Sequence, residues 1–381
     1  MLRLYSIAIV LHAYVGWRLL PSVQDFGTAA FVTMATWLVL SAWLLPQVLY
    51  ARRSRHRLVS DAFVWASALA MGSFSSLFVL TFLRDVGLLV AGALDLAVPN
   101  TIAMPSLVDW SAAAVPILAA ALTLVGFYNA RRRPVVRSVD VAIAGLPSAL
   151  HGFTIAQISD VHVGPTIRRR YVDVIVDAVN ALEVDMVAIT GDLVDGTVAQ
   201  LSPHTQPLSR LASRHGSYFV TGNHEYYSGV LGWVTELRRL GLRVLMNEHV
   251  VLDHKGENVV VAGVTDYSAH LFYDSHRSDP AVAIAGAPRN AGVRLLLAHQ
   301  PRSALVAQTA GYDLQLSGHT HGGQFWPWIF FVRMQQPFTA GLRRLGSLWV
   351  YTSRGTGYWG PPKRVGAPSE ITRLRLVAAQ L

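Results

Sequence analysis

Five short motifs that combine carboxylates, imidazoles and one amide lie directly after predicted strands. They are Asp160-x-His162, Gly191-Asp192-x-x-Asp195, Gly222-Asn223-His224-Glu225, Ala298-His299 and Gly318-His319-Thr320-His321. In α/β sheets, ligands collect at the carboxyl ends of strands. Each motif alone is typical of a solvated turn or a structural histidine. All five together, in order and at strand ends, predict one shared site.

The donor atoms of these motifs are carboxylate and amide oxygens and imidazole nitrogens. No thiolate is available, because the chain has no cysteine. This mixture suits divalent ions such as Mn, Fe or Zn. More than four candidate ligands imply two ions, with one carboxylate bridging ions ~3.5–4 Å apart, and such pairs activate water for attack on phosphorus. The motifs therefore predict phosphoryl chemistry at a site with two metal ions.

The elements that must position these motifs alternate between strands and helices after Arg133. "HGFTIAQISD" and "MVAITGD" predict strands that end in the first two motifs, and "RRYVDVIVDAVNALEVD" predicts an amphipathic helix. Further strands are predicted at "NVVVAGVTD", "VRLLLAHQ", "DLQLSGH", "LWVYTS" and "ITRLRLVA", and helices at "PLSRLASRHG" and "LGWVTELRRLG". This order predicts a strand-rich α/β domain rather than a helical bundle.

The first third of the chain is predicted to lie in a membrane. Apolar residues form 52% of the chain and charged residues only 14%, against about 25% charged in soluble domains. Each of four apolar runs is near the ~20 residues that cross a bilayer: Leu4–Leu20, Thr28–Tyr50, Ala62–Leu83 and Ala112–Tyr128. The alternatives are a signal peptide for the first run, or buried helices of a soluble domain. The predicted domains are a four-helix transmembrane region (1–133) and a catalytic domain (134–381). The short apolar segment Val86–Val98 either extends the third span or lies in the interface.

Arginine placement predicts the orientation. Arginines 52, 53, 55 and 57 fill the loop between spans two and three, and arginines 131–133 follow span four, whereas Arg84 is balanced by Asp85. The positive-inside rule places the arginine-rich loops in the cytoplasm. An even number of spans then predicts a multi-pass protein of the inner (cytoplasmic) membrane with its catalytic domain facing the cytoplasm. Since much of the net charge of +9 lies in these loops, no nucleic-acid partner is predicted.

The order of motifs resembles the calcineurin-like metallophosphoesterase superfamily over roughly Val135–Leu381. The closing stretch "YTSRGTGYWGPPKRVGAPSEITRL" is similar to the tail of the bacterial membrane-associated branch, which includes pyrophosphatases that act on UDP-2,3-diacylglucosamine. The resemblance implies a β-sandwich core flanked by helices and two divalent metal ions. It also implies in-line attack on a phosphodiester or pyrophosphate bond by a hydroxide that bridges the ions.

The resemblance also implies roles for individual residues. One ion would be held by Asp160, His162 and His321, and the other by Asn223, His299 and His319, with Asp192 bridging. His224 would be the general acid that protonates the leaving oxygen, oriented by Asp195. Glu225 is expected to support its loop.

An apolar, aromatic run follows the last motif. Trp326 and Phe330 are expected to line a lipid-tail groove or touch the bilayer, unless they fill the core. Arg354, Lys363 and Arg364 are expected to meet a phosphate or anionic headgroups, unless they are solvated surface. We therefore predict a membrane-anchored phosphoesterase with a lipid- or nucleotide-linked substrate. The alternatives are a phosphoprotein phosphatase, or a membrane sensor or transport protein that uses the phosphatase fold as a binding module.

Overall fold

The computed structural model describes residues 2–53 and 61–379. Contacts divide the chain into two units. Unit 1 comprises Met1–Asn129 and Gly360–Lys363, and unit 2 comprises Ala130–Trp359 and Arg364–Leu381. The predicted boundary at residue 133 placed Gly360–Lys363 in the catalytic domain, whereas the contacts group this segment with unit 1.

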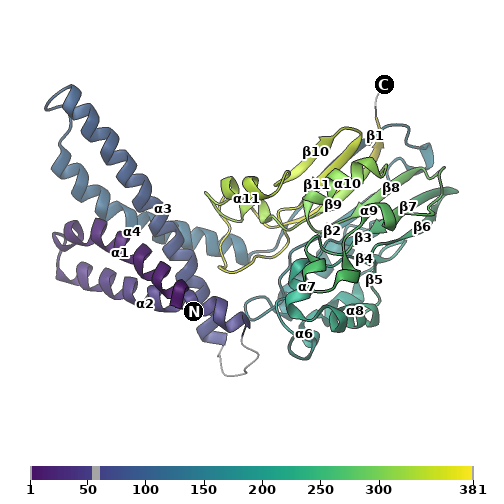
Figure 1. Cartoon of the computed structure of the whole chain (residues 1–381), viewed down its shortest axis with the longest axis horizontal. Coiled ribbons are helices and arrows are strands. Elements are labelled where there is room, and N and C mark those ends of the chain that lie inside the picture. The colour runs from purple at the N-terminus through teal and green to yellow at the C-terminus, as the bar shows by residue number, and fades with distance from the viewer. Residues whose placement is uncertain (1, 54–60, 380–381) are drawn as a thin grey trace. The chain divides into compact units, whose positions relative to one another are not determined.

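Unit 1 consists of long apolar helices. They are α1 (Leu2–Gln24), α2 (Thr28–Arg53), α3 (Asp61–Ala97) and α4 (Met104–Arg131) (Figure 1). In the part of the chain that the structure describes, these four are long and apolar enough to cross a membrane, which confirms the predicted spans. The segment 86–97 continues α3, whose 37 residues extend over about 55 Å. Arginines 55 and 57 lie outside the described residues.

Several polar side chains inside unit 1 have partners within that unit. Asp85 accepts hydrogen bonds from Tyr14 (2.7 Å) and Arg18 (2.8 Å), and Arg84 lies 3.3 Å from the same carboxylate. Lys363 is 2% exposed, and its ammonium group donates to the Gly72 carbonyl and to two hydroxyls of α3 and α4. Pairing of this kind is what makes charges tolerable among apolar helices.

Unit 2 contains two six-stranded sheets. The first has the order β1 (Val135–Ile143), β12 (Glu370–Ala378), β2 (Thr154–Ile158), β3 (Met186–Ile189), β4 (Ser217–Phe219) and β5 (Arg243–Val244). The second has the order β10 (Gly341–Leu345), β11 (Leu348–Thr352), β9 (Leu314–Ser317), β8 (Val293–Leu297), β7 (Glu257–Gly263) and β6 (Glu248–His254). One apolar core joins residues of both sheets, including Ile155 and Met186 from the first and Val261 and Leu295 from the second. This is the predicted β-sandwich.

α-Helices flank the strands of unit 2. They are α5 (Arg169–Asn180), α6 (Val198–Thr205), α7 (Asn223–Ser228), α8 (Val230–Arg239), α9 (Pro280–Ile284), α10 (Ala304–Thr309) and α11 (Ile329–Gln335) (Figure 1). In α5 the predicted apolar stripe, including Ile175 and Val179, is buried against Ile158 and Val187 of the first sheet. The predicted helix "PLSRLASRHG" is wrong: only a 3-10 turn (Gln206–Arg210) forms there, and the α-helix lies just before it.

The register of the sheets explains how the motifs meet. Strands β2, β3 and β4 are mutually parallel, and so are β7, β8, β9 and β11. The carboxyl ends of parallel strands share one edge of their sheet. The five motifs follow β2, β3, β4, β8 and β9, so both sheets deliver their polar side chains at such an edge.

Candidate metal centre and active site

The loops that carry the motifs adopt an unusual backbone conformation. Five residues lie in the left-handed region, with φ angles of 53°, 55°, 51°, 70° and 51° at Asp160, His162, Asp192, His319 and His321. Residues with a Cβ adopt this conformation at an energetic cost, so it persists where the surroundings enforce it, commonly at functional sites. The tight exits from the strands turn these five side chains toward one another.

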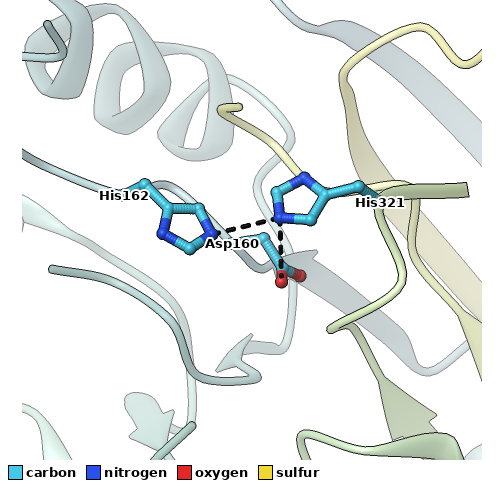
Figure 2. Close-up of side chains that lie close together, drawn as sticks. All are labelled: Asp160, His162 and His321. Carbon is cyan, nitrogen blue, oxygen red and sulfur yellow. Dashed lines mark hydrogen bonds and ion pairs between the residues drawn. The ribbon is translucent and has the colours of Figure 1, made fainter. Parts of the chain in front are cut away.

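Asp160, His162 and His321 form the first group of donor atoms. The Nε2 atoms of His162 and His321 are 3.1 Å apart, and His321 Nε2 is 3.5 Å from an oxygen of Asp160 (Figure 2). All three residues are at most 8% exposed. Two imidazole nitrogens at this distance require a proton or a cation between them, because their lone pairs repel.

Asp192, His299 and His319 form the second group. An oxygen of Asp192 lies 3.2 Å from His299 Nε2, which in turn lies 3.2 Å from His319 Nδ1. The same Asp192 oxygen is 4.0 Å from His162 Nε2, so Asp192 stands between the two groups. The side-chain amide oxygen of Asn223 (Oδ1) is buried and accepts no hydrogen bond from the described residues, which suits a metal ligand. The residues present therefore fit a pair of divalent ions.

Outer contacts fix which nitrogen of each imidazole faces the site. His299 Nδ1 lies 2.7 Å from the Thr190 carbonyl, so its proton is on Nδ1 and Nε2 keeps a lone pair. His162 Nδ1 lies 3.1 Å from Asp195. Asp195 thus serves two histidines, because His224 Nδ1 approaches the same oxygen at 2.5 Å. The sequence motifs predicted only the second contact.

His224 lies in the first turn of α7, and its side chain extends toward Asp192. Its Nε2 is 3.9 Å from Asp192, and its side chain is 13% exposed, so a substrate can reach it. With Asp195 on Nδ1, the Nε2 atom is the one that can exchange a proton with a bound molecule.

Glu225 holds the second and third motifs together. Its carboxylate accepts backbone hydrogen bonds from Gly222 (2.7 Å), Asp192 (3.0 Å), Leu193 (2.8 Å) and Val194 (3.3 Å). The side chain is fully buried, and both of its oxygens are engaged by these backbone donors. Its contacts match the expected loop-supporting role.

Two glycines allow the loops to pass close to the carboxylates. A Cβ on Gly222 would lie 2.2 Å from an Asp192 oxygen, and one on Gly318 would lie 2.2 Å from an Asp160 oxygen. No side chain larger than hydrogen fits at either position. The glycines of the G-N-H-E and G-H-x-H motifs are therefore required by close packing beside the ligands.

Burial and charge set the protonation of the imidazoles. Burial lowers the pKa of His319 to about 3 and holds the pKa of His321 well below its usual range. Burial also disfavours a charge on His299, but the neighbouring Asp192 raises its pKa well above the ordinary value. Burial likewise opposes ionisation of Asp192, yet His299 and His224 hold its pKa well below the usual range. An ionised Asp192 and neutral imidazoles at His319 and His321 are the forms that bind metals, whereas the charge of Asp192 favours the protonated form of His299.

The candidate substrate residues differ in exposure. Trp326 is 46% exposed and Phe330 is 54% exposed, so they do not fill the core. Arg354 pairs with Glu370 at 3.0 Å and remains partly exposed. Lys363 lies buried in unit 1, as described above. Arg364 is 1% exposed and donates to the carbonyls of His321, Arg354 and Ala367. These contacts indicate that Arg364 supports the loop that carries His321.

Comparison with known proteins places the chain in a family. The family model of the calcineurin-like phosphoesterases matches residues 153–323, which carry all five motifs. The chain is 36% identical over 263 residues to an uncharacterized metallophosphoesterase of Campylobacter jejuni, covering 68% of each protein. The chain belongs to the calcineurin-like metallophosphoesterase family. It is 38% identical over 271 residues to a fish (Danio rerio) protein called transmembrane protein with metallophosphoesterase domain, covering 69% of this chain and 62% of that protein.

A cattle (Bos taurus) protein of the same name is 41% identical over 269 residues, covering 68% of this chain and 60% of the relative. The chain therefore spans about three fifths of the length of each of these two animal relatives. Their names agree with the four apolar helices of unit 1. The chain is a membrane protein with a metallophosphoesterase domain.

Proposed function

We propose that this protein is a membrane-anchored metallophosphoesterase that hydrolyses a phosphodiester or pyrophosphate bond with two divalent metal ions. The observation that carries the proposal is the shared position of Asp192, 3.2 Å from His299 and 4.0 Å from His162. Asp160, His162 and His321 would hold one ion, and Asn223, His299 and His319 the other. The donor set suits Mn, Fe or Zn.

The bound ions would supply Lewis-acid stabilisation of phosphoryl charge and would lower the pKa of water at the site. Proton transfer to the leaving group is carried out by side chains of the protein. Asp195 orients His224 through Nδ1, and His224 donates a proton from Nε2 to the leaving oxygen. Six of the seven proposed ligands are at most 9% exposed and His319 is half-buried, so little water reaches the ligands, and this strengthens each electrostatic contact.

A lipid-linked substrate at the cytoplasmic face of the inner membrane is the finer part of the proposal, with a nucleotide-linked substrate as the other possibility. Unit 1 supports the lipid, because its four helices keep unit 2 beside a bilayer. The exposed rings of Trp326 and Phe330 also support it, since aromatic side chains are favoured at membrane interfaces. The arginines near residues 52–57 and 131–133 support the orientation.

Hydrolysis of bis(p-nitrophenyl) phosphate by the full chain in detergent tests the proposed reaction. Activity should vanish after treatment with a chelator and return with Mn²⁺ or Zn²⁺. Asp192→Asn should abolish it. Asp173→Asn is the matched control, because Asp173 is an aspartate of α5 that pairs with Arg210 at the surface. A wild-type protein with no metal-dependent hydrolysis would make unit 2 a binding module.

A panel of substrates tests the finer proposal. Lipid pyrophosphates, phospholipid diesters, nucleotide diesters and phosphopeptides are compared at matched concentration in the same detergent. The proposal expects the highest kcat/KM for an acylated substrate. A preference for phosphopeptides would instead support the phosphoprotein phosphatase.

A further inference from the structure

Two exposed aromatic rings flank His224. Tyr227 in α7 lies 5.3 Å from the His224 ring, centre to centre, at an interplanar angle of 67°. Trp359, in the loop after β11, lies 5.9 Å from the same ring at 81°. Tyr227 is 64% exposed and Trp359 is 39% exposed. Both rings therefore contact the histidine edge to face while presenting apolar surface to a bound molecule.

Contacts with the surrounding scaffold anchor both residues. Tyr227 lies one helical turn after Asn223 and packs 5.6 Å from Phe272. The backbone of Trp359 is held from both sides by Gln324, which accepts from its N–H at 2.8 Å and donates to its carbonyl at 2.9 Å. Gln324 follows His321 by three residues. The two aromatic positions are thus tied to the loops that carry the candidate ligands.

We propose that Tyr227 and Trp359 bind the leaving group of the substrate and select an apolar alcohol. This inference rests on the proposed function and on the role of His224 in it. The general acid must lie within hydrogen-bond reach of the leaving oxygen. The carbon skeleton attached to that oxygen therefore passes beside the rings that contact His224.

The chemistry of the acid favours an alcohol over a phosphate as the leaving group. When the P–O bond breaks, its electron pair stays on the leaving oxygen, which takes the proton from His224 Nε2. Water supplies the oxygen that replaces it on phosphorus, and a proton from that water restores His224. An alkoxide needs this proton, whereas a phosphate leaves as a stable anion.

The test compares methyl phosphodiesters whose second alcohol is 2-naphthol, n-octanol or glycerol. Release of each alcohol is measured for the full chain and for Tyr227→Ala and Trp359→Ala. We expect kcat/KM to fall roughly 5- to 150-fold for the naphthyl or octyl ester, the range that one aromatic contact provides. The glyceryl ester should change by less than about threefold. A fall in kcat/KM for the naphthyl ester alone would identify an aromatic alcohol as the preferred leaving group. A fall for the octyl ester as well would identify an aliphatic chain.

Conservative variants separate contact from simple positioning. Tyr227→Phe and Trp359→Phe keep a ring and should keep most of the selectivity. Phe331→Ala is the control, because Phe331 is another exposed aromatic residue (54%) and lies on α11. It should leave kcat/KM for all three esters at the wild-type value. Equal losses for all three esters, or none, would overturn the inference while leaving the hydrolase intact. A wild-type chain that cleaves none of the esters nor bis(p-nitrophenyl) phosphate would overturn both proposals.

Discussion

Replacing Glu225 by glutamine should loosen the loops that carry Asp192 and Asn223. The two carboxylate oxygens each accept two backbone N–H groups, at distances from 2.7 to 3.3 Å. Glutamine turns one oxygen into an NH₂ group that faces two of these donors. A buried donor without an acceptor costs ~1–3 kcal/mol. The two that lose their acceptor should therefore weaken the local structure by about 2–6 kcal/mol.

Hydrogen exchange followed by mass spectrometry measures this change at the amides themselves. Peptides that contain Asp192–Val194 and Gly222 should exchange at least roughly 30-fold faster in Glu225→Gln, since ~1.4 kcal/mol corresponds to a factor of ten. Glu236→Gln is the matched control. Glu236 is also poorly exposed, at 8%, but its partner is the exposed Arg239, so a loss of ~0–1 kcal/mol is expected.

The protonation of Glu225 decides the outcome. Burial, followed by the charge of Asp192, raises the pKa of Glu225 to about 8, whereas the N–H groups of Gly222 and Leu193 lower it. We assign an ionised carboxylate, because a protonated oxygen would direct its hydrogen at two N–H donors. If Glu225 were protonated, glutamine would imitate it. Unchanged exchange in Glu225→Gln would then refute the assignment.

Four further predictions follow from the site and the helices. His224→Ala should lower turnover by roughly 10²–10⁴ with unchanged metal content, and the loss should shrink for p-nitrophenol, a leaving group that needs no proton; equal losses for good and poor leaving groups would remove the acid role. Elemental analysis of the active wild-type protein should find two divalent ions per chain, and Asp192→Asn should reduce that content; one ion at full activity would end the dimetal proposal. A reporter that is active only in the periplasm, fused after Leu381, should stay silent, and a strong signal would reverse the orientation. Phe330→Ala should raise KM for a long-chain lipid substrate more than for a soluble aryl phosphate without lowering the melting temperature, because the ring is 54% exposed; a lower melting temperature with parallel kinetic losses would argue for a packing role.

The sequence by itself determined the elements that carry the site. Runs of apolar residues predicted the four long helices, because a bilayer core demands about 20 such residues. The apolar stripe of α5 and the short runs at β2, β3, β8 and β9 predicted their type, since burial on one or both faces leaves a periodic signature. Polar residues and glycines directly after those strands marked the candidate ligand positions. These signals are local, so they can be read from neighbouring residues.

Only the tertiary structure decided which distant residues meet. His162 and His321 are separated by 159 positions, and their 3.1 Å approach depends on the order and register of strands in two packed sheets. The same holds for Asp195 between two histidines, and for Trp359 beside His224. Lys363 and Arg364 looked alike as cations, yet one is buried in unit 1 and the other beneath His321. Type and spacing do not distinguish a phosphate contact from a buried support, because that distinction lies in burial and in partners from remote parts of the chain.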